Sequence, residues 1–102
     1  GGYAQSAVAS IVTLDENDTC KDVRMVLMSV AEVPILSQKA GEILIGNKPT
    51  KEAIEEVAEA VTAGEIDPAT DLHASADYRR SITRVLIVRS LTEAFERAKR
   101  GG

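Results

Sequence analysis

Apolar and β-branched residues dominate two stretches near the start of the chain, and a polar cluster separates them. The first stretch, residues 3–14, reads YAQSAVASIVTL, and the second, residues 20–31, reads CKDVRMVLMSVA. β-Branched residues favour strands, and the intervening residues 15–18 (DEND) are typical of a turn. The pattern therefore predicts an antiparallel hairpin with strands at 3–14 and 20–31.

The second stretch does not alternate cleanly between apolar and polar residues. Its odd positions carry Val23, Met25 and Leu27, and from Val26 onward the even positions are apolar as well. A strand with one face in water normally alternates. Two interpretations stay open. Either the sheet is covered on both faces, by its own helices and by something outside this chain, or a strongly twisted hairpin buries its own second face.

Pro34 is predicted to end the second strand, because proline has no N–H to donate to a ladder and restricts the residue before it. Two strands make a poor sheet, so a third is expected. It would come from a break within residues 14–31 or from chain that precedes Gly1. Because the chain reaches a strand directly after Gly1-Gly2, we expect a piece of a longer subunit.

Three helices are predicted after the strands, at 38–45, 51–63 and 76–100. Ser37, Thr50 and Ser75 stand where N-caps are needed, and Gly46 and Gly64 stand where helices end. The second helix has one apolar face, and so does the third, with Ile87 and Val88 widening its stripe until the central turns are buried nearly all round. That stripe consists of Tyr78, Ile82, Val85, Leu86, Leu91, Phe95 and Ala98.

Strands followed by helices predict a single α+β domain over residues 1–102. Its expected architecture is a two-layer sandwich, with an antiparallel sheet of about three strands and three helices on one face. Apolar residues form 44% of the chain and charged residues 27%, which is the composition of an ordinary folded domain. No apolar run approaches the length of a membrane span.

Charge is divided unevenly along the chain. Residues 42–72 carry eight acidic and two basic residues, whereas residues 76–100 carry seven basic and three acidic ones. We interpret this as two helices of opposite sign that either pack near each other or are simply solvated. Nucleic acid is a poor partner, because acids interrupt the basic residues and aromatic residues form only 3% of the chain.

Candidates for chemistry are few. His73 with Asp71 and Ser75 suggests a hydrolase, but Ser75 is explained as a helix cap, and triad members usually come from separate elements. Cys20 has no second cysteine with which to form a disulfide, and one cysteine with one histidine cannot form a zinc site. We therefore predict no catalytic, cofactor-binding or metal-binding residue in this chain.

Adjacent arginines, Arg79 and Arg80, open the third helix. Because successive helical residues point about 100° apart, one of them can face inward, where it needs a carboxylate. Asp67 and Asp71 precede it, so we predict an Arg–Asp clamp that holds the 65–75 segment on the helix start.

A family resemblance is carried by residues 71–80, which read DLHASADYRR, and by the apolar helix that follows. Together with the two strands, Pro34, and Glu42, Leu44 and Gly46 of the first helix, they resemble the closing segment of the flavoprotein (medium) subunits of molybdenum hydroxylases. This family includes aerobic carbon monoxide dehydrogenase and xanthine dehydrogenase. The Ser-Ala-x-Tyr-Arg-Arg piece at residues 75–80 is fairly specific, whereas Ser29 and Ser81 depart from the family pattern. We take Asp71, Ser75, Tyr78, Arg79 and Arg80 as a structural motif.

The resemblance implies the fold of the carbon monoxide dehydrogenase flavoprotein C-terminal domain. It also implies a parent subunit that carries FAD in preceding domains. That subunit takes electrons from an iron–sulfur subunit beside a molybdopterin subunit, and relays them to an acceptor. A cytoplasmic location is expected, because the single cysteine points to a reducing compartment. The glycine-rich FAD motifs of the family have no counterpart here, so this domain is expected to brace the FAD domains and the subunit assembly. The alternative is a stand-alone interaction or dimerisation domain.

Overall fold

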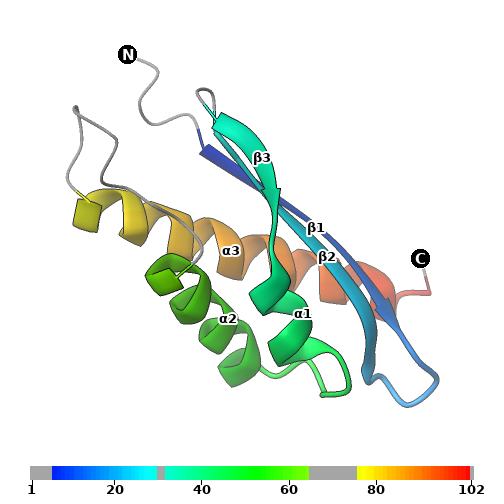
Figure 1. Ribbon diagram of the computed structural model, residues 1–102. Helices are drawn as coiled ribbons and strands as arrows, with labels where there is room; N and C mark the ends of the chain where they lie inside the picture. Colours follow the sequence, from blue (N-terminus) through cyan, green and yellow to red (C-terminus); the bar gives the residue numbers. More distant parts are fainter. Residues whose placement is uncertain (1–5, 30–31, 65–75, 102) are drawn as a thin grey trace.

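The computed structural model describes residues 6–29, 32–64 and 76–101, and shows helices on one face of an antiparallel sheet (Figure 1). A few residues are described in their backbone only: Ser6, Ser29, Glu32, Val33, Ala76, Asp77 and Arg79. The sheet order is β1-β2-β3. The predicted two-layer α+β architecture is confirmed. The elements are β1 (Ser6–Leu14), β2 (Cys20–Ser29), β3 (Glu32–Leu36), α1 (Gln38–Leu44), α2 (Lys51–Gly64) and α3 (Ala76–Lys99).

The third strand lies where the sequence analysis predicted a strand end. Pro34 does not stop the sheet, because it lies inside β3, which pairs antiparallel with the second half of β2. Both predicted sources of the third strand were therefore wrong. Proline is tolerated because β3 is an edge strand and because the register shifts between Leu27 and Ser29, so the absent N–H breaks no regular ladder.

The strand register assigns each side chain to one face of the sheet. Residues directly opposite each other share a face, so the buried residues Met25 and Leu27 define the inner face, next to the helices. The inner pairs are Val8–Leu27, Ser10–Met25 and Val12–Val23, and the outer pairs are Ala7–Met28, Ala9–Val26, Ile11–Arg24 and Thr13–Asp22. Leu36 of β3 lies opposite Val26 and so belongs to the outer face.

The hairpin turn is held by backbone hydrogen bonds, from Asp15 N–H to the Thr19 carbonyl and from Asp18 N–H to the Asp15 carbonyl, and by the Asp15 side chain. Asp15 Oδ1 accepts hydrogen bonds from the backbone N–H groups of Asn17, at 2.8 Å, and Thr19, at 2.9 Å. Asp18 adopts a left-handed conformation with φ of 60°, which aspartate tolerates in turns. The predicted polar turn is confirmed.

Helix α1 begins and ends as its flanking residues predict. Ser37 Oγ accepts a hydrogen bond from the N–H of Ala40 at 3.2 Å. After the helix, Gly46 takes a φ of +88°, and its N–H donates to the Cys20 carbonyl at 2.8 Å, while Cys20 N–H donates to the Asn47 carbonyl at 2.9 Å. The segment after α1 is thereby fastened to the start of β2.

Helix α2 is capped by Thr50, whose Oγ1 accepts from the N–H of Ala53 at 3.0 Å. Its predicted apolar face is buried: Ile54, Val57, Ala58 and Val61 all belong to the core. Helix α2 packs against both α1 and α3, and α3 packs on β1 (Figure 1). Within the ranges described, each helix is too short or too polar to cross a lipid bilayer.

Helix α3 buries a narrower stripe than the sequence predicted. Its buried residues are Ile87, Leu91, Ala94 and Phe95, at helical spacing. Tyr78, in the first turn, is 51% exposed. Val85, nearer the middle, is 54% exposed, so the central turns are not buried all round. The reason is geometric, because β1 and α2 cover only one side of α3 and leave the other in water.

We expect Ile87→Ala on α3 to lower the free energy of unfolding by about 2–5 kcal/mol, because it leaves a cavity in the core. Val85→Ala, two residues away and exposed, should change it by no more than about 0.5 kcal/mol. Urea unfolding followed by circular dichroism measures both. Equal losses for the two variants would contradict the core assignment.

Candidate functional site

The residues singled out in the sequence fall at the start of α3 and in the segment before it. Tyr78 is exposed and Arg80 is half-buried. Asp71, His73 and Ser75 lie outside the described residues, and so do the side chains of Asp77 and Arg79. The structure therefore leaves the His73 interpretation and the helix cap of Ser75 as predictions.

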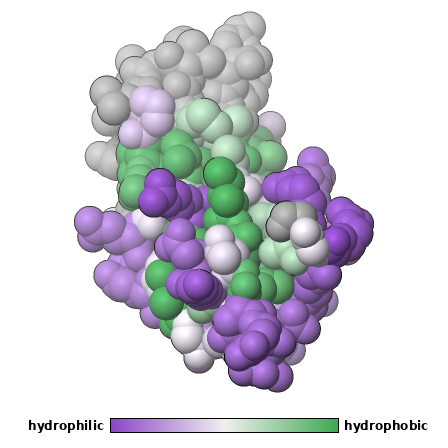
Figure 2. All heavy atoms as spheres, turned by 90° about the vertical axis from the view of Figure 1, so that its right-hand side faces the viewer, coloured by the Kyte–Doolittle hydropathy of each residue, from purple (hydrophilic) through white to green (hydrophobic). Residues whose placement is uncertain are grey.

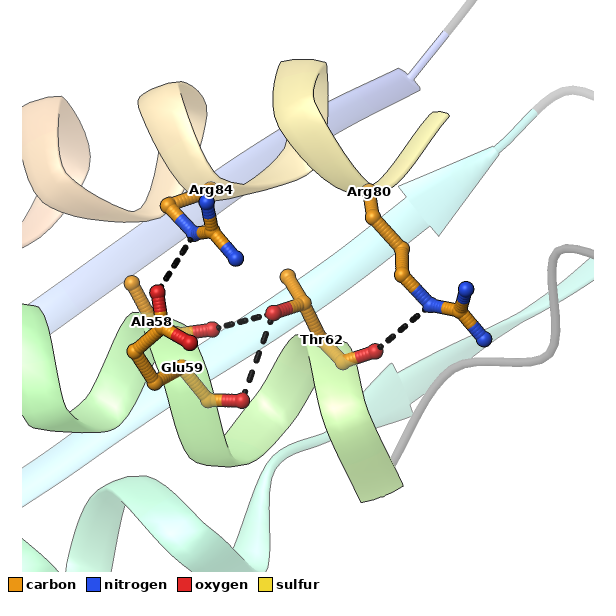
Figure 3. Close-up of polar contacts among 5 residues, drawn as sticks. All are labelled: Ala58, Glu59, Thr62, Arg80 and Arg84. Carbon is orange, nitrogen blue, oxygen red and sulfur yellow. Dashed lines mark hydrogen bonds and ion pairs between the residues drawn. The ribbon is translucent and has the colours of Figure 1, made fainter. Parts of the chain in front are cut away.

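Arg80 joins the start of α3 to the end of α2 (Figure 3). Its Nε donates a hydrogen bond to the Thr62 carbonyl at 3.3 Å. The buried Thr62 hydroxyl in turn donates to the carbonyls of Ala58, at 2.7 Å, and Glu59, at 3.3 Å. Arg80 thus contacts a neighbouring helix through a backbone carbonyl, whereas the sequence analysis predicted a carboxylate partner for an inward-facing arginine. Both aspartates of the proposed clamp lie outside the described residues, so the clamp stays a prediction.

An ion pair links the acidic and basic helices one turn further along. Arg84 Nε lies 2.9 Å from Glu59 Oε1 (Figure 3). Both side chains are largely exposed, so the pair contributes at most about 1 kcal/mol. The predicted packing of two helices of opposite charge is confirmed. The hollow beside this pair has a volume of about 330 Å³ and is lined by Glu52, Glu55, Glu56, Ala58, Glu59, Arg84 and Val88.

Polar groups also join α3 to β1. Ser90 Oγ donates to Ser10 Oγ at 2.7 Å, and Arg97 donates through Nη2 to the Ser10 carbonyl at 3.4 Å. A shallow groove of about 280 Å³ runs along this contact between α3 and β1, and Arg89 and Glu93 are among the residues that line it. Sequence reasoning missed these partners, because they are 80 or more residues apart and follow no local pattern. Of the residues in the α2–α3 and α3–β1 contacts, Thr62 alone stands out in the sequence. It is a polar residue one turn after Ala58 on the apolar face of α2.

Cys20 is a core residue with 1% of its surface exposed. Its thiol donates to the Asp22 carbonyl at 3.5 Å. Burial, aided by the negative charge of Asp22, raises the pKa of the thiol above its ordinary value, so the nucleophilic thiolate is disfavoured. No group of three or more metal-ligating His, Cys, Asp or Glu side chains occurs among the residues that the structure describes.

The outer face of the sheet carries the large aliphatic side chains of the strands that have the highest exposed fractions. Ile11 is 69% exposed and Leu36 is 59% exposed. Figure 2 views the molecule from the side on which the strands lie in Figure 1, and shows hydrophobic surface gathered there, bordered by hydrophilic surface. The apolar even positions of β2 lie on this face. The exposure of Ile11 and Leu36 counts against a hairpin that buries its own second face, and a cover from outside this chain stays a prediction.

Taken together, these features define a small two-layer α+β domain in which Arg80, Arg84, Ser90 and Arg97 join elements of the chain to one another. Comparison with known proteins identifies the family to which this domain belongs. Residues 1–94 match the family described as the CO dehydrogenase flavoprotein C-terminal domain, and the chain belongs to this family. The resemblance to the medium subunits of molybdenum hydroxylases is thereby confirmed.

Two curated relatives match nearly the whole chain. It is 36% identical over 99 residues to the 6-hydroxypseudooxynicotine dehydrogenase complex subunit alpha of Paenarthrobacter nicotinovorans, covering 97% of this chain and 33% of that protein. It is 33% identical over 102 residues to the carbon monoxide dehydrogenase medium chain of Afipia carboxidovorans, covering 97% and 34%. The chain thus spans about a third of the length of these relatives.

Solved structures show the same fold. Quinoline 2-oxidoreductase from Pseudomonas putida 86 superposes with a TM-score of 0.80 at 25% identity, over 91% of this chain and 32% of that one. Reconstituted CO dehydrogenase from Oligotropha carboxidovorans superposes with a TM-score of 0.77 at 28% identity, over 91% and 32%.

The Ser10–Ser90 contact should show energetic coupling. Ser90→Ala leaves the buried Ser10 hydroxyl without this partner, so we expect a loss of about 1–3 kcal/mol in the free energy of unfolding. Adding Ser10→Ala should cost less than the sum of the single changes, because both partners are then gone. Urea unfolding of the four chains of this double-mutant cycle measures the coupling. Strict additivity would show that the two hydroxyls do not interact.

Cys20 should make the fold sensitive to alkaline pH. The thiol pKa is higher in the folded than in the unfolded chain, so its stabilising effect is complete below the unfolded value, near 9.0, and is lost as pH rises through the folded value. The free energy of unfolding should therefore fall above about pH 9 more steeply in the unsubstituted chain than in Cys20→Ala. Urea unfolding across a pH series measures the difference, and parallel curves would refute it.

Proposed function

We propose that this chain is the C-terminal structural domain of the FAD-containing medium subunit of a cytoplasmic molybdenum hydroxylase. Its role is to support the FAD domains and the assembly of the subunits. The observation that carries the proposal is the family match, which covers nearly all of this chain but only a third of each relative. The remaining two thirds of such a subunit are where the FAD domains are expected.

The surfaces of the described residues support placing the flavin elsewhere. An FAD diphosphate needs backbone N–H groups or cations, and its ring needs an enclosed apolar pocket. The hollow between α2 and α3 presents four glutamates, which repel a diphosphate. The groove beside β1 is shallow, and Glu93 lies among its arginines. Neither surface fits FAD, and we assign no flavin ligand to the described residues.

In the parent enzyme, we propose that electrons pass from molybdopterin through iron–sulfur centres to FAD and then to an acceptor. The relatives support this class of chemistry, since they are named as dehydrogenases or oxidoreductases. One structure similar to this chain is that of a carbon monoxide dehydrogenase from Hydrogenophaga pseudoflava that lacks the Mo-pyranopterin moiety of its molybdenum cofactor. Partner subunits would hold molybdopterin and the iron–sulfur clusters.

A second candidate is a stand-alone dimerisation domain. The exposed outer face of the sheet favours it, because two such faces could cover each other. Light scattering of the purified chain across a dilution series separates the two functions. A dimer that persists on dilution supports the second candidate, whereas a monomer supports the first.

The proposed function predicts where flavin is found. The purified 102-residue chain should be colourless and inactive in dye reduction, because it provides no flavin site, whereas the complete subunit should be yellow with about one FAD. Absorbance at flavin wavelengths and flavin release on denaturation measure both. A yellow preparation of the isolated chain, or a complete subunit without flavin, would overturn the proposal.

A further inference from the structure

The outer face of the sheet changes in polarity along the strands. At the hairpin end it carries the polar pair Thr13–Asp22, followed by Arg24 of β2, which lies opposite Ile11 of β1. From Ile11 toward the opposite end, where β1 begins, the paired residues assigned to the outer face are otherwise apolar: Ala7, Ala9, Ile11, Val26, Met28 and Leu36. Asp22 and Arg24 also form an exposed ion pair at 3.8 Å, so the polar end is suited to water.

The helices of this chain do not cover that apolar end. All three lie on the inner side, where they bury Met25 and Leu27 (Figure 1). A sheet face that stays in water is normally polar, and a contiguous apolar patch on a sheet indicates a contact surface. The outer face therefore calls for a second layer from outside the described residues.

The position of the apolar end indicates which molecule supplies that layer. β1 enters the sheet at Ser6, beside the apolar ladders, while the hairpin at residues 15–18 projects away at the polar end (Figure 1). The family is a C-terminal domain, and the relatives are about three times as long as this chain. In such a subunit the preceding polypeptide arrives at the apolar end, where the connection is shortest.

We propose that the apolar end of the outer face docks on the preceding domains of the same polypeptide, which completes a three-layer arrangement of helices, sheet and FAD domains. This inference rests on the proposed function and adds to it the contact surface and the occupant. The exposed fractions of Ile11 and Leu36 should fall most on docking, because these are the most exposed large aliphatic side chains of the outer face.

Cysteine labelling of the complete medium subunit, purified without its partner subunits, tests the docking. Ile11→Cys and Leu36→Cys place thiols on the outer face, and Glu55→Cys, exposed on α2, is the matched control. Native Cys20 is buried and serves as the unreactive reference. A maleimide should label positions 11 and 36 at least about tenfold more slowly than position 55. Peptide mass spectrometry assigns each label, and denaturant should make all sites reactive.

Each other outcome overturns the docking. Fast labelling at positions 11 and 36 leaves the face open, and protection only after the partner subunits are added assigns it to another chain. Protection that disappears on dilution assigns it to a second copy. Flavin content of the same samples tests the proposed function separately. A subunit with FAD and fast labelling rejects only the docking, whereas a subunit without FAD rejects the proposed function itself.

Discussion

A sheet has two faces, and the helices of this chain cover one of them. The burial of the side chains on the two faces of the sheet follows from that constraint. The inner side chains Met25 and Leu27 can be buried because α1, α2 and α3 all lie on the same side. Burial of such apolar groups is the main favourable term in folding, so the inner layer forms the core. The outer side chains Ile11 and Leu36 remain exposed for the same reason.

Local chemistry made much of the fold predictable. The cap residues Ser37 and Thr50 start their helices as expected, since a hydroxyl that accepts a nearby N–H needs only the sequence around it. Pro34 was misjudged because its cost depends on whether a strand is central or at an edge, which is a property of the sheet. Val85 was misjudged because the periodicity of α3 does not show how many neighbours cover it.

The polar contacts between elements were less predictable than the surfaces. Ser10 meets Ser90 across 80 positions, and Arg80 reaches the Thr62 carbonyl across 18, so neither pair leaves a local pattern. The loss of alternation from Val26 onward left two interpretations open, a sheet covered on both faces or a hairpin that buries its own second face, because alternation along a strand reports directly on the two faces. The exposure of Ile11 and Leu36 counts against the second interpretation. Our proposal that preceding domains of the same polypeptide cover that face rests on the change of polarity along the strands.

The central claim is that this domain is a structural layer that packs on the rest of its own subunit. The most direct measurement is an experimental structure of the complete medium subunit, in which the exposed fraction of the Ile11 side chain is compared with its 69% here. The account predicts that Ile11 is covered by residues of the same polypeptide that precede Gly1. An Ile11 side chain that remains as exposed as it is here would contradict the account.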